Sequence, residues 1–215
     1  MSPTTTAAAA SDVTLGGATQ VTSGGATTTV SAVSSTVPVV ASTPAGFQRA
    51  ADPEGSVSIA VPSSWAVVPL DDRTLEQLAN AGSAFPAETR AQLQNAVAQA
   101  GEYMKVLTVG PADATGVSPT VNVVIVPGST PVPALKAVYP QQAQAVGGTV
   151  VSTDDLTVDG RPAVRFVLKV KMSGGELLST QVVIPADAKT LIVSIANVEP
   201  TLLAQVIASI VVPKR

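Results

Sequence analysis

Apolar residues alternate with polar or small residues along several stretches of the chain, as in strands with one buried face. The first stretch covers residues 57–61 and ends at Pro62, and Trp65 soon after it is expected to fill the core. Two further short strands are predicted at 105–109 and 120–126. The second of these is apolar on both faces, so we expect it to lie in the middle of a sheet.

The second half of the chain predicts four strands in succession, at 149–158, 163–172, 177–184 and 190–198. They are separated by Asp159-Gly160, by Ser173-Gly174-Gly175 and by Pro185-Ala186-Asp187. These residue types are typical of tight hairpin turns, so neighbouring strands are expected to run antiparallel.

Helices are predicted where apolar residues recur three or four positions apart. Three are expected near 71–82, 86–101 and 133–146. A last helix begins at Pro200 and places four apolar residues on one face, Leu202, Leu203, Val206 and Ile210. Helices combined with hairpins predict an α+β fold in which a central antiparallel β-sheet is sandwiched between helices.

Residues 1–45 differ from the rest of the chain in composition. They contain a single charged residue, Asp12, no aromatic residue, and 18 Thr or Ser. Such a segment has too little large apolar surface to offset the entropy of ordering, so we expect a disordered tail before a domain at 46–215. Three roles fit this composition: a flexible spacer between an anchor and the domain, a segment for O-glycosylation, and a terminus with no role of its own.

The charge and the missing residue types argue against several classes of function. The chain has 12 Lys and Arg against 15 Asp and Glu, a net charge of −3 without blocks of either sign, so nucleic acid and anionic lipid are not expected partners. It has no His and no Cys, which removes the Ser-His-Asp triad, the thiolate nucleophile and the usual zinc ligands. We expect no cofactor, no bound metal and no transmembrane segment.

The start of the chain bears on its location. The residues from Met1 to Thr6 have neither the basic start nor the apolar core of a signal peptide. Either the protein is cytosolic, or this is the mature form of an exported protein after removal of a leader. The Thr- and Ser-rich tail favours the second interpretation, an extracytoplasmic protein that is secreted or membrane-anchored.

Residues 47–65 carry a motif of several parts. An aromatic residue, Phe47, precedes an Asp-Pro-x-Gly turn at 52–55, and a strand that ends at Pro62 is followed by Trp65. This stretch resembles the opening of the PsbP-like superfamily.

Two later segments fit the same plan, Asp-Gly-Arg-Pro-Ala at 159–163 and Ser-Ile-Val-Val at 209–212, so the resemblance covers residues 46–213. It looks closest to the LpqN-type lipoproteins of actinobacteria, in which a signal peptide, a lipidated Cys and a Thr/Ser/Ala/Pro-rich spacer precede this domain. The leader and the Cys are missing here, so the resemblance implies either a mature form or a non-lipidated relative. It also implies a helix-covered antiparallel sheet that serves in binding or assembly, without shared catalytic residues.

Three basic residues, Arg165, Lys169 and Lys171, lie on one side of a predicted strand and are the candidate binding residues. One interpretation is a basic stripe that meets an acidic partner. The other is an outward face whose long side chains cover apolar surface beneath them, since Val167 interrupts the stripe.

Acidic residues give weaker candidates. Asp154, Asp155 and Asp159 cluster around one predicted hairpin, but they lack the spacing of a calcium loop, and Asp-Gly is ordinary turn chemistry. The glutamates are scattered along the chain, and no catalytic residue is assigned.

The expected function is therefore that of a non-enzymatic binding or assembly module of the bacterial cell envelope. Its partner is expected to be an envelope protein, or a small apolar ligand held between sheet and helices. A contiguous exposed apolar patch would mark a binding surface. The alternative is a carboxylate-dependent hydrolase, which would need two inward-facing carboxylates in one pocket.

Overall fold

The computed structural model describes residues 43–68, 70, 101–114, 116–145, 147–172 and 175–213. Most of the predicted tail and nearly all of the two helices predicted at 71–82 and 86–101 lie outside these residues. The domain boundary placed at residue 46 therefore stays a prediction.

The described residues form two antiparallel sheets and a few helices. The strands are β1 (Phe47–Ala51), β2 (Ser58–Pro62), β3 (Ala66–Val67), β4 (Met104–Val109), β5 (Thr120–Pro127), β6 (Gly148–Val158), β7 (Arg161–Met172), β8 (Gly175–Ala186) and β9 (Lys189–Ala196). The helices are η1 (Gly101–Tyr103), α3 (Val132–Ala145) and α4 (Pro200–Ala208). Within the described part of the chain, β1 pairs with β2, and the larger sheet has the order β3-β4-β5-β9-β8-β7-β6.

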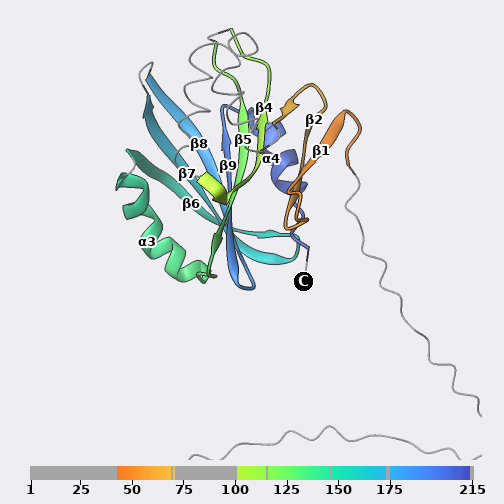
Figure 1. The fold of residues 1–215 in the computed structure, drawn as a ribbon. Coiled ribbons are helices and arrows are strands. Elements are labelled where there is room, and N and C mark those ends of the chain that lie inside the picture. Colours follow the sequence, from red (N-terminus) through yellow and green to blue (C-terminus); the bar gives the residue numbers. More distant parts are fainter. Residues whose placement is uncertain are drawn as a thin grey trace, which may run out of the picture. The chain divides into compact units, whose positions relative to one another are not determined.

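The larger sheet is covered on both faces (Figure 1). One core lies where α4 and the β1–β2 hairpin pack on the sheet, around buried residues such as Val123, Val182 and Val193. The second core lies under α3, around Val164 and Phe166. The predicted α+β fold with a helix-covered antiparallel sheet is confirmed. Among the described helices, none has both the length and the hydropathy to cross a membrane.

Two local predictions differ from the structure. Strand β1 was not predicted, because Phe47–Ala51 shows no alternation and becomes a strand only by pairing with β2. Ile210 was placed on the last helix, but α4 ends at Ala208. Ile210 is buried beyond the helix end because the next residue, Val211, forms a β-bridge with Ser58.

The Asp-Pro-x-Gly motif forms a turn closed by its own aspartate. Asp52 is buried, and its two carboxylate oxygens accept hydrogen bonds from the backbone N–H groups of Glu54 (3.2 Å) and Ser56 (3.1 Å). Gly55 has a φ of 67°, a conformation that Gly adopts at little cost. The motif is therefore explained by the geometry of the turn between β1 and β2.

Ser209 joins the end of α4 to strand β2. Its hydroxyl accepts a hydrogen bond from the N–H of Ala60 at 2.8 Å and lies 2.7 Å from the carbonyl oxygen of Val206, to which it donates. Both Ser209 and Ala60 are buried, so the hydroxyl satisfies backbone groups that water does not reach. The last turn of α4 is thereby fixed on the sheet.

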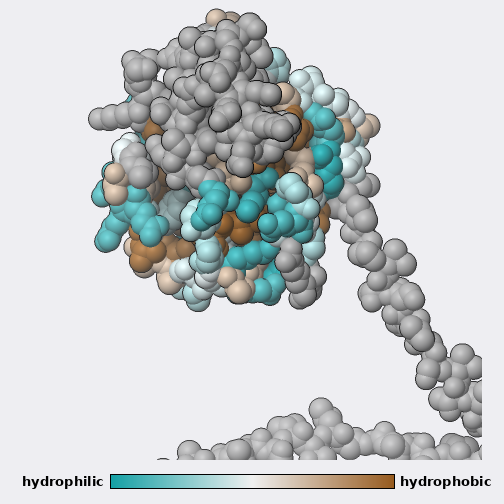
Figure 2. All heavy atoms as spheres, in the orientation of Figure 1, coloured by the Kyte–Doolittle hydropathy of each residue, from teal (hydrophilic) through white to brown (hydrophobic). Residues whose placement is uncertain are grey.

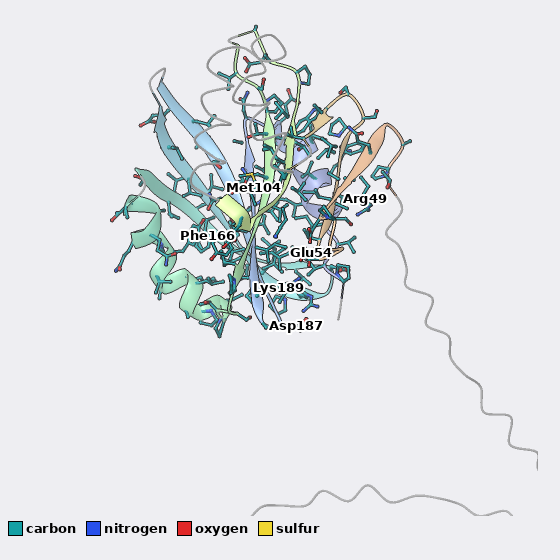
Figure 3. The ribbon with its side chains drawn as sticks, in the orientation of Figure 1. Arg49, Glu54, Met104, Phe166, Asp187 and Lys189 are labelled. Carbon is teal, nitrogen blue, oxygen red and sulfur yellow. The ribbon has the colours of Figure 1, made fainter. Side chains whose placement is uncertain are left out.

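The core under α3 contains a stacked aromatic pair. The rings of Tyr139, from α3, and Phe166, from β7, have centroids 4.3 Å apart and an interplanar angle of 12°. Figure 3 shows Phe166 on the α3 side of the sheet. Burial makes the phenolate form unfavourable and raises the pKa of Tyr139 from 10.0 to about 12.

This raised pKa predicts a loss of stability at alkaline pH. In the unfolded chain Tyr139 ionises near pH 10, and in the folded chain only near pH 12, so its stabilising contribution is complete below pH 10 and disappears as the pH rises through 12. Tyr139→Phe should remove this part of the alkaline decline, which amounts to about 2 kcal/mol between about pH 9 and about pH 11.5. Urea midpoints at about pH 9 and about pH 11.5 measure it.

The matched control is Tyr103→Phe, because the Tyr103 side chain is exposed. That variant should lose stability with pH as the wild type does. A decline equally steep in all three proteins would contradict the burial of the Tyr139 hydroxyl.

Candidate functional site

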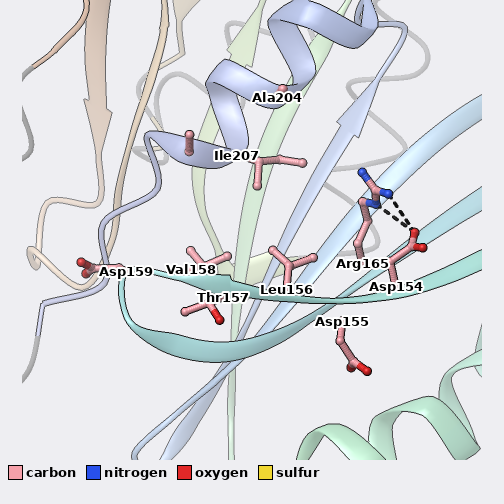
Figure 4. Close-up of a pocket in the computed structure, with 10 residues that line it drawn as sticks. Asp154, Asp155, Leu156, Thr157, Val158, Asp159, Arg165, Ala204 and Ile207 are labelled. Atoms are coloured by element: carbon pink, nitrogen blue, oxygen red, sulfur yellow. Dashed lines mark hydrogen bonds and ion pairs between the residues drawn. The ribbon is translucent and has the colours of Figure 1, made fainter.

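A groove runs between α4 and strand β6, on the face of the sheet that α4 covers in part (Figure 4). Its volume is about 390 Å³. Leu156 and Val158 point from β6 toward the helix, and Ile207 and Ala204 point back from α4. The groove combines this apolar lining with charged groups, Arg165, Asp154 and Asp155 toward one end and Asp159 at the other.

An ion pair between neighbouring strands lies at one end of the groove. Arg165 of β7 donates two hydrogen bonds to Oδ2 of Asp154 in β6, from Nε at 3.1 Å and from Nη2 at 2.9 Å. Both side chains are partly exposed, so the pair contributes little to stability. Its main effect is that the rim carries no net charge at this point.

The three aspartates that cluster in the sequence, Asp154, Asp155 and Asp159, bind different partners. Asp155 extends to the opposite face, where its Oδ2 lies 2.6 Å from Nζ of Lys136 in α3. Asp159 stands at the hairpin turn and accepts a hydrogen bond from the N–H of Val212 at 2.8 Å. In the described part of the chain, no three acidic side chains gather in a way that could hold a metal ion.

The predicted basic stripe lies on the same face as the groove. Arg165 and Lys169 have the same strand parity in β7, and each has an acidic neighbour, Asp154 for the first and Glu176 (3.1 Å) for the second. The side chain of Lys171 is outside the described residues. That the stripe binds a partner stays a prediction, and any acidic partner must compete with these ion pairs.

A second groove of about 560 Å³ lies at another end of the sheet. It combines the carboxylates of Asp113, Glu176 and Glu199 with the exposed Leu178 and with prolines of the β4–β5 loop. Asn197 helps to shape it, because its side-chain amide donates to Oδ2 of Asp113 at 3.2 Å. This groove has a larger volume than the first and, unlike it, no basic residue in its lining.

The hydrolase alternative needs two inward-facing carboxylates in one pocket, and among the described residues no pocket holds two buried ones: Asp113, Glu176 and Glu199 share the second groove but are all exposed. Asp154 and Asp155 are on opposite faces, and the described glutamates, Glu54, Glu102, Glu176 and Glu199, are exposed. Glu76 and Glu88 lie outside the described residues.

Large exposed apolar side chains come from five different elements of the described chain. They are Val67, Tyr103, Val138, Val151 and Leu178. On the face shown in Figure 2, apolar residues likewise lie among polar ones.

Sequence reasoning missed the wall that α4 contributes to the groove. It identified the buried face of the helix through Val206, which is fully buried, but not the flank that carries Ala204 and Ile207. The partner of Arg165 could have been predicted from the sequence, because counting back along both strands from the Asp159-Gly160 turn places Asp154 opposite Arg165.

Several solved structures are similar to this chain. The solution structure of cyanobacterial PsbP (CyanoP) from Synechocystis is 13% identical, covers 79% of this chain and 94% of its own, and gives a TM-score of 0.48. LpqN of Mycobacterium tuberculosis, described as involved in cell envelope biogenesis, is 13% identical, covers 78% of this chain and 92% of its own, and gives a TM-score of 0.45.

A putative regulator of unknown function from Pseudomonas aeruginosa is 20% identical, covers 46% of this chain and 70% of its own, and gives a TM-score of 0.38. No protein-family model matches the sequence, and no curated protein matches it. At these identities the likeness concerns the fold alone.

Proposed function

We propose that the protein is a non-enzymatic binding or assembly module of the bacterial cell envelope, secreted or membrane-anchored as a mature lipoprotein. The observation that carries the binding role is the groove between α4 and β6. Its ionisable groups form ion pairs or bond to backbone groups. No two of them point to the same position in the groove as a pair of catalytic groups would. Such a lining suits recognition better than general acid–base chemistry, which needs a proton carrier within reach of a bound substrate.

The location outside the cytoplasm is supported by composition and motif. Residues 1–45 have the Thr/Ser/Ala-rich composition of a flexible spacer, and the Asp-Pro-x-Gly motif resembles the opening of a domain that follows such spacers in lipoproteins. A spacer lets a domain reach partners at some distance from its anchor.

Two measurements in the source bacterium test the proposal. Fractionation with an antibody against the domain is expected to find the protein in the envelope or the medium. A photo-crosslinking amino acid at Ala204, in the wall of the groove, is expected to give a discrete adduct in intact cells. The control is the same amino acid at Val138, which is exposed on α3.

The outcomes separate the alternatives. A cytosolic protein, or equal adducts at Ala204 and Val138, contradicts the proposal. A stoichiometric small molecule retained by the purified protein in native mass spectrometry would instead identify a carrier of an apolar ligand. Turnover of ester or glycoside substrates would support the hydrolase.

A further inference from the structure

Strand β6 is the last strand of the larger sheet. Among the described strands it pairs only with β7. It is 11 residues long, and Ser152, Thr153, Asp155 and Thr157 along it are exposed. An edge of this length offers a row of backbone donors and acceptors to another extended chain.

The turn after β6 determines which backbone groups face outward. Asp159 and Gly160 have φ angles of 49° and 73°, as in a two-residue type I′ hairpin. The flanking pair, Val158 and Arg161, then exchanges both of its hydrogen bonds, and alternate residues toward the start of β6 do the same. The groups that point away from β7 are therefore those of Thr153, Asp155 and Thr157.

The groove follows this edge of the sheet. It is lined by every residue from Asp154 to Asp159, although the side chains of neighbouring residues point to opposite faces of the strand. Consecutive residues of a strand line one groove only where the groove runs along the backbone of that strand. The α4 residues Ala204 and Ile207 form its other wall.

We propose that an extended segment of another polypeptide adds to β6 as a further strand of the sheet, and that this segment alternates apolar and basic residues. The inference rests on the proposed binding function and specifies the partner. Backbone hydrogen bonds would be made to Thr153, Asp155 and Thr157. Apolar side chains of the segment would enter the groove against Leu156 and Ile207.

Charge argues for basic residues on the other side of the segment. Asp154 contacts Arg165 and Asp155 contacts Lys136 through Oδ2, which leaves Oδ1 of each carboxylate as an acceptor, and Asp155 is the one that lies on the side away from the groove. The Asp155 side chain is 70% exposed. A second copy of this chain, paired antiparallel about the middle of β6, would bring these carboxylates against their own equivalents.

The length of the site is also defined. The pairing of β6 with β7 shifts register between Val150 and Ser152. A bulge at this point interrupts the regular edge, so the added strand is expected to pair with the part from Ser152 to Val158.

The test uses a synthetic peptide of the stated chemistry, acetyl-Val-Lys-Val-Lys-Val-Lys-Val-amide, and the full chain. Amide hydrogen exchange by NMR is expected to slow about tenfold or more at Thr153, Asp155 and Thr157 when the peptide is added. Asp154 and Leu156 already donate to β7 and are expected to change little. The same peptide with alternate backbone nitrogens methylated should not bind, because it cannot donate to the edge.

Proline at one outward position gives the matched variants. Thr157→Pro removes an outward N–H without removing a bond to β7, a placement that edge strands tolerate, and should weaken peptide binding about tenfold. Thr157→Ala should bind as the wild type does. Circular dichroism verifies that both variants are folded.

The proposal is overturned if the peptide fails to bind at about 1 mM, binds both variants equally, or protects amides elsewhere. If an adduct at Ala204 forms in cells while the peptide fails, strand addition is wrong and the binding function stands. If the peptide binds as described while the protein is cytosolic, the envelope location is wrong and strand addition stands.

Discussion

Phe166→Ala is expected to lower the free energy of unfolding by about 4 kcal/mol. The Phe166 ring is fully buried between the sheet and α3, and it stacks on Tyr139. Helix α3 has few other anchors, because its buried residues are Leu135 and Ala143. Loss of the ring leaves a cavity that a helix containing Pro140 is poorly placed to fill, and the amides of α3 should exchange faster as well.

Urea unfolding measures the effect, and Val167→Ala is the control. Val167 is the next residue of β7 and points to the other face, where it is only partly buried, so its truncation should cost about 1 kcal/mol. Equal losses in the two variants would contradict the assignment of Phe166 to the core under α3.

Gly110→Ala is expected to destabilise the protein by about 3 kcal/mol, by overpacking. A Cβ at this position would lie 2.6 Å from Cγ of Pro119 and 2.7 Å from Cε2 and Nε1 of Trp65. The proline and indole rings are both stiff, and the backbone N–H of Gly110 is bonded to the Pro119 carbonyl at 2.8 Å, so none of the three yields easily.

The control is Gly148→Ala, a second glycine without a positive φ. Its Cβ would lie 3.2 Å from the Ala143 carbonyl oxygen and 3.4 Å from Leu168, and shifts of a few tenths of an ångström relieve that contact. The expected cost of this substitution is about 1 kcal/mol. Because Trp65 is the single tryptophan, its fluorescence reports on the Gly110 variant directly, and an unchanged spectrum with unchanged stability would contradict the contact.

The fold was predictable where local sequence determines it. Strands β6 to β9 follow from alternation and from turn residues such as Asp159-Gly160, and their observed bounds lie within a few residues of the prediction. The burial of Trp65 was also predicted and is confirmed. Strand β1 was not predictable in this way, because its pairing with β2 and not its own pattern makes it a strand.

The candidate site was less accessible to sequence reasoning. The basic stripe was visible as a period of two, but its neutralisation depends on cross-strand neighbours such as Asp154 and Glu176. The groove exists because α4 covers only part of its face of the sheet and leaves a gap beside β6. The position of α4 on the sheet is set by tertiary packing, so it cannot be predicted from the residue types of α4 alone.

The link between Ser209 and β2 has a consequence for how the chain acquires its structure. The hydroxyl of Ser209 and the N–H of Ala60 are 149 positions apart in the sequence, and the β-bridge from Ser58 to Val211 spans a similar interval. Contacts of such high sequence separation form late and slowly. The packing of the β1–β2 hairpin against the end of α4 is therefore expected to be completed only after the last residues have left the ribosome. A chain truncated before Ser209 should therefore keep the turn at Asp52 but lose the anchoring of β2.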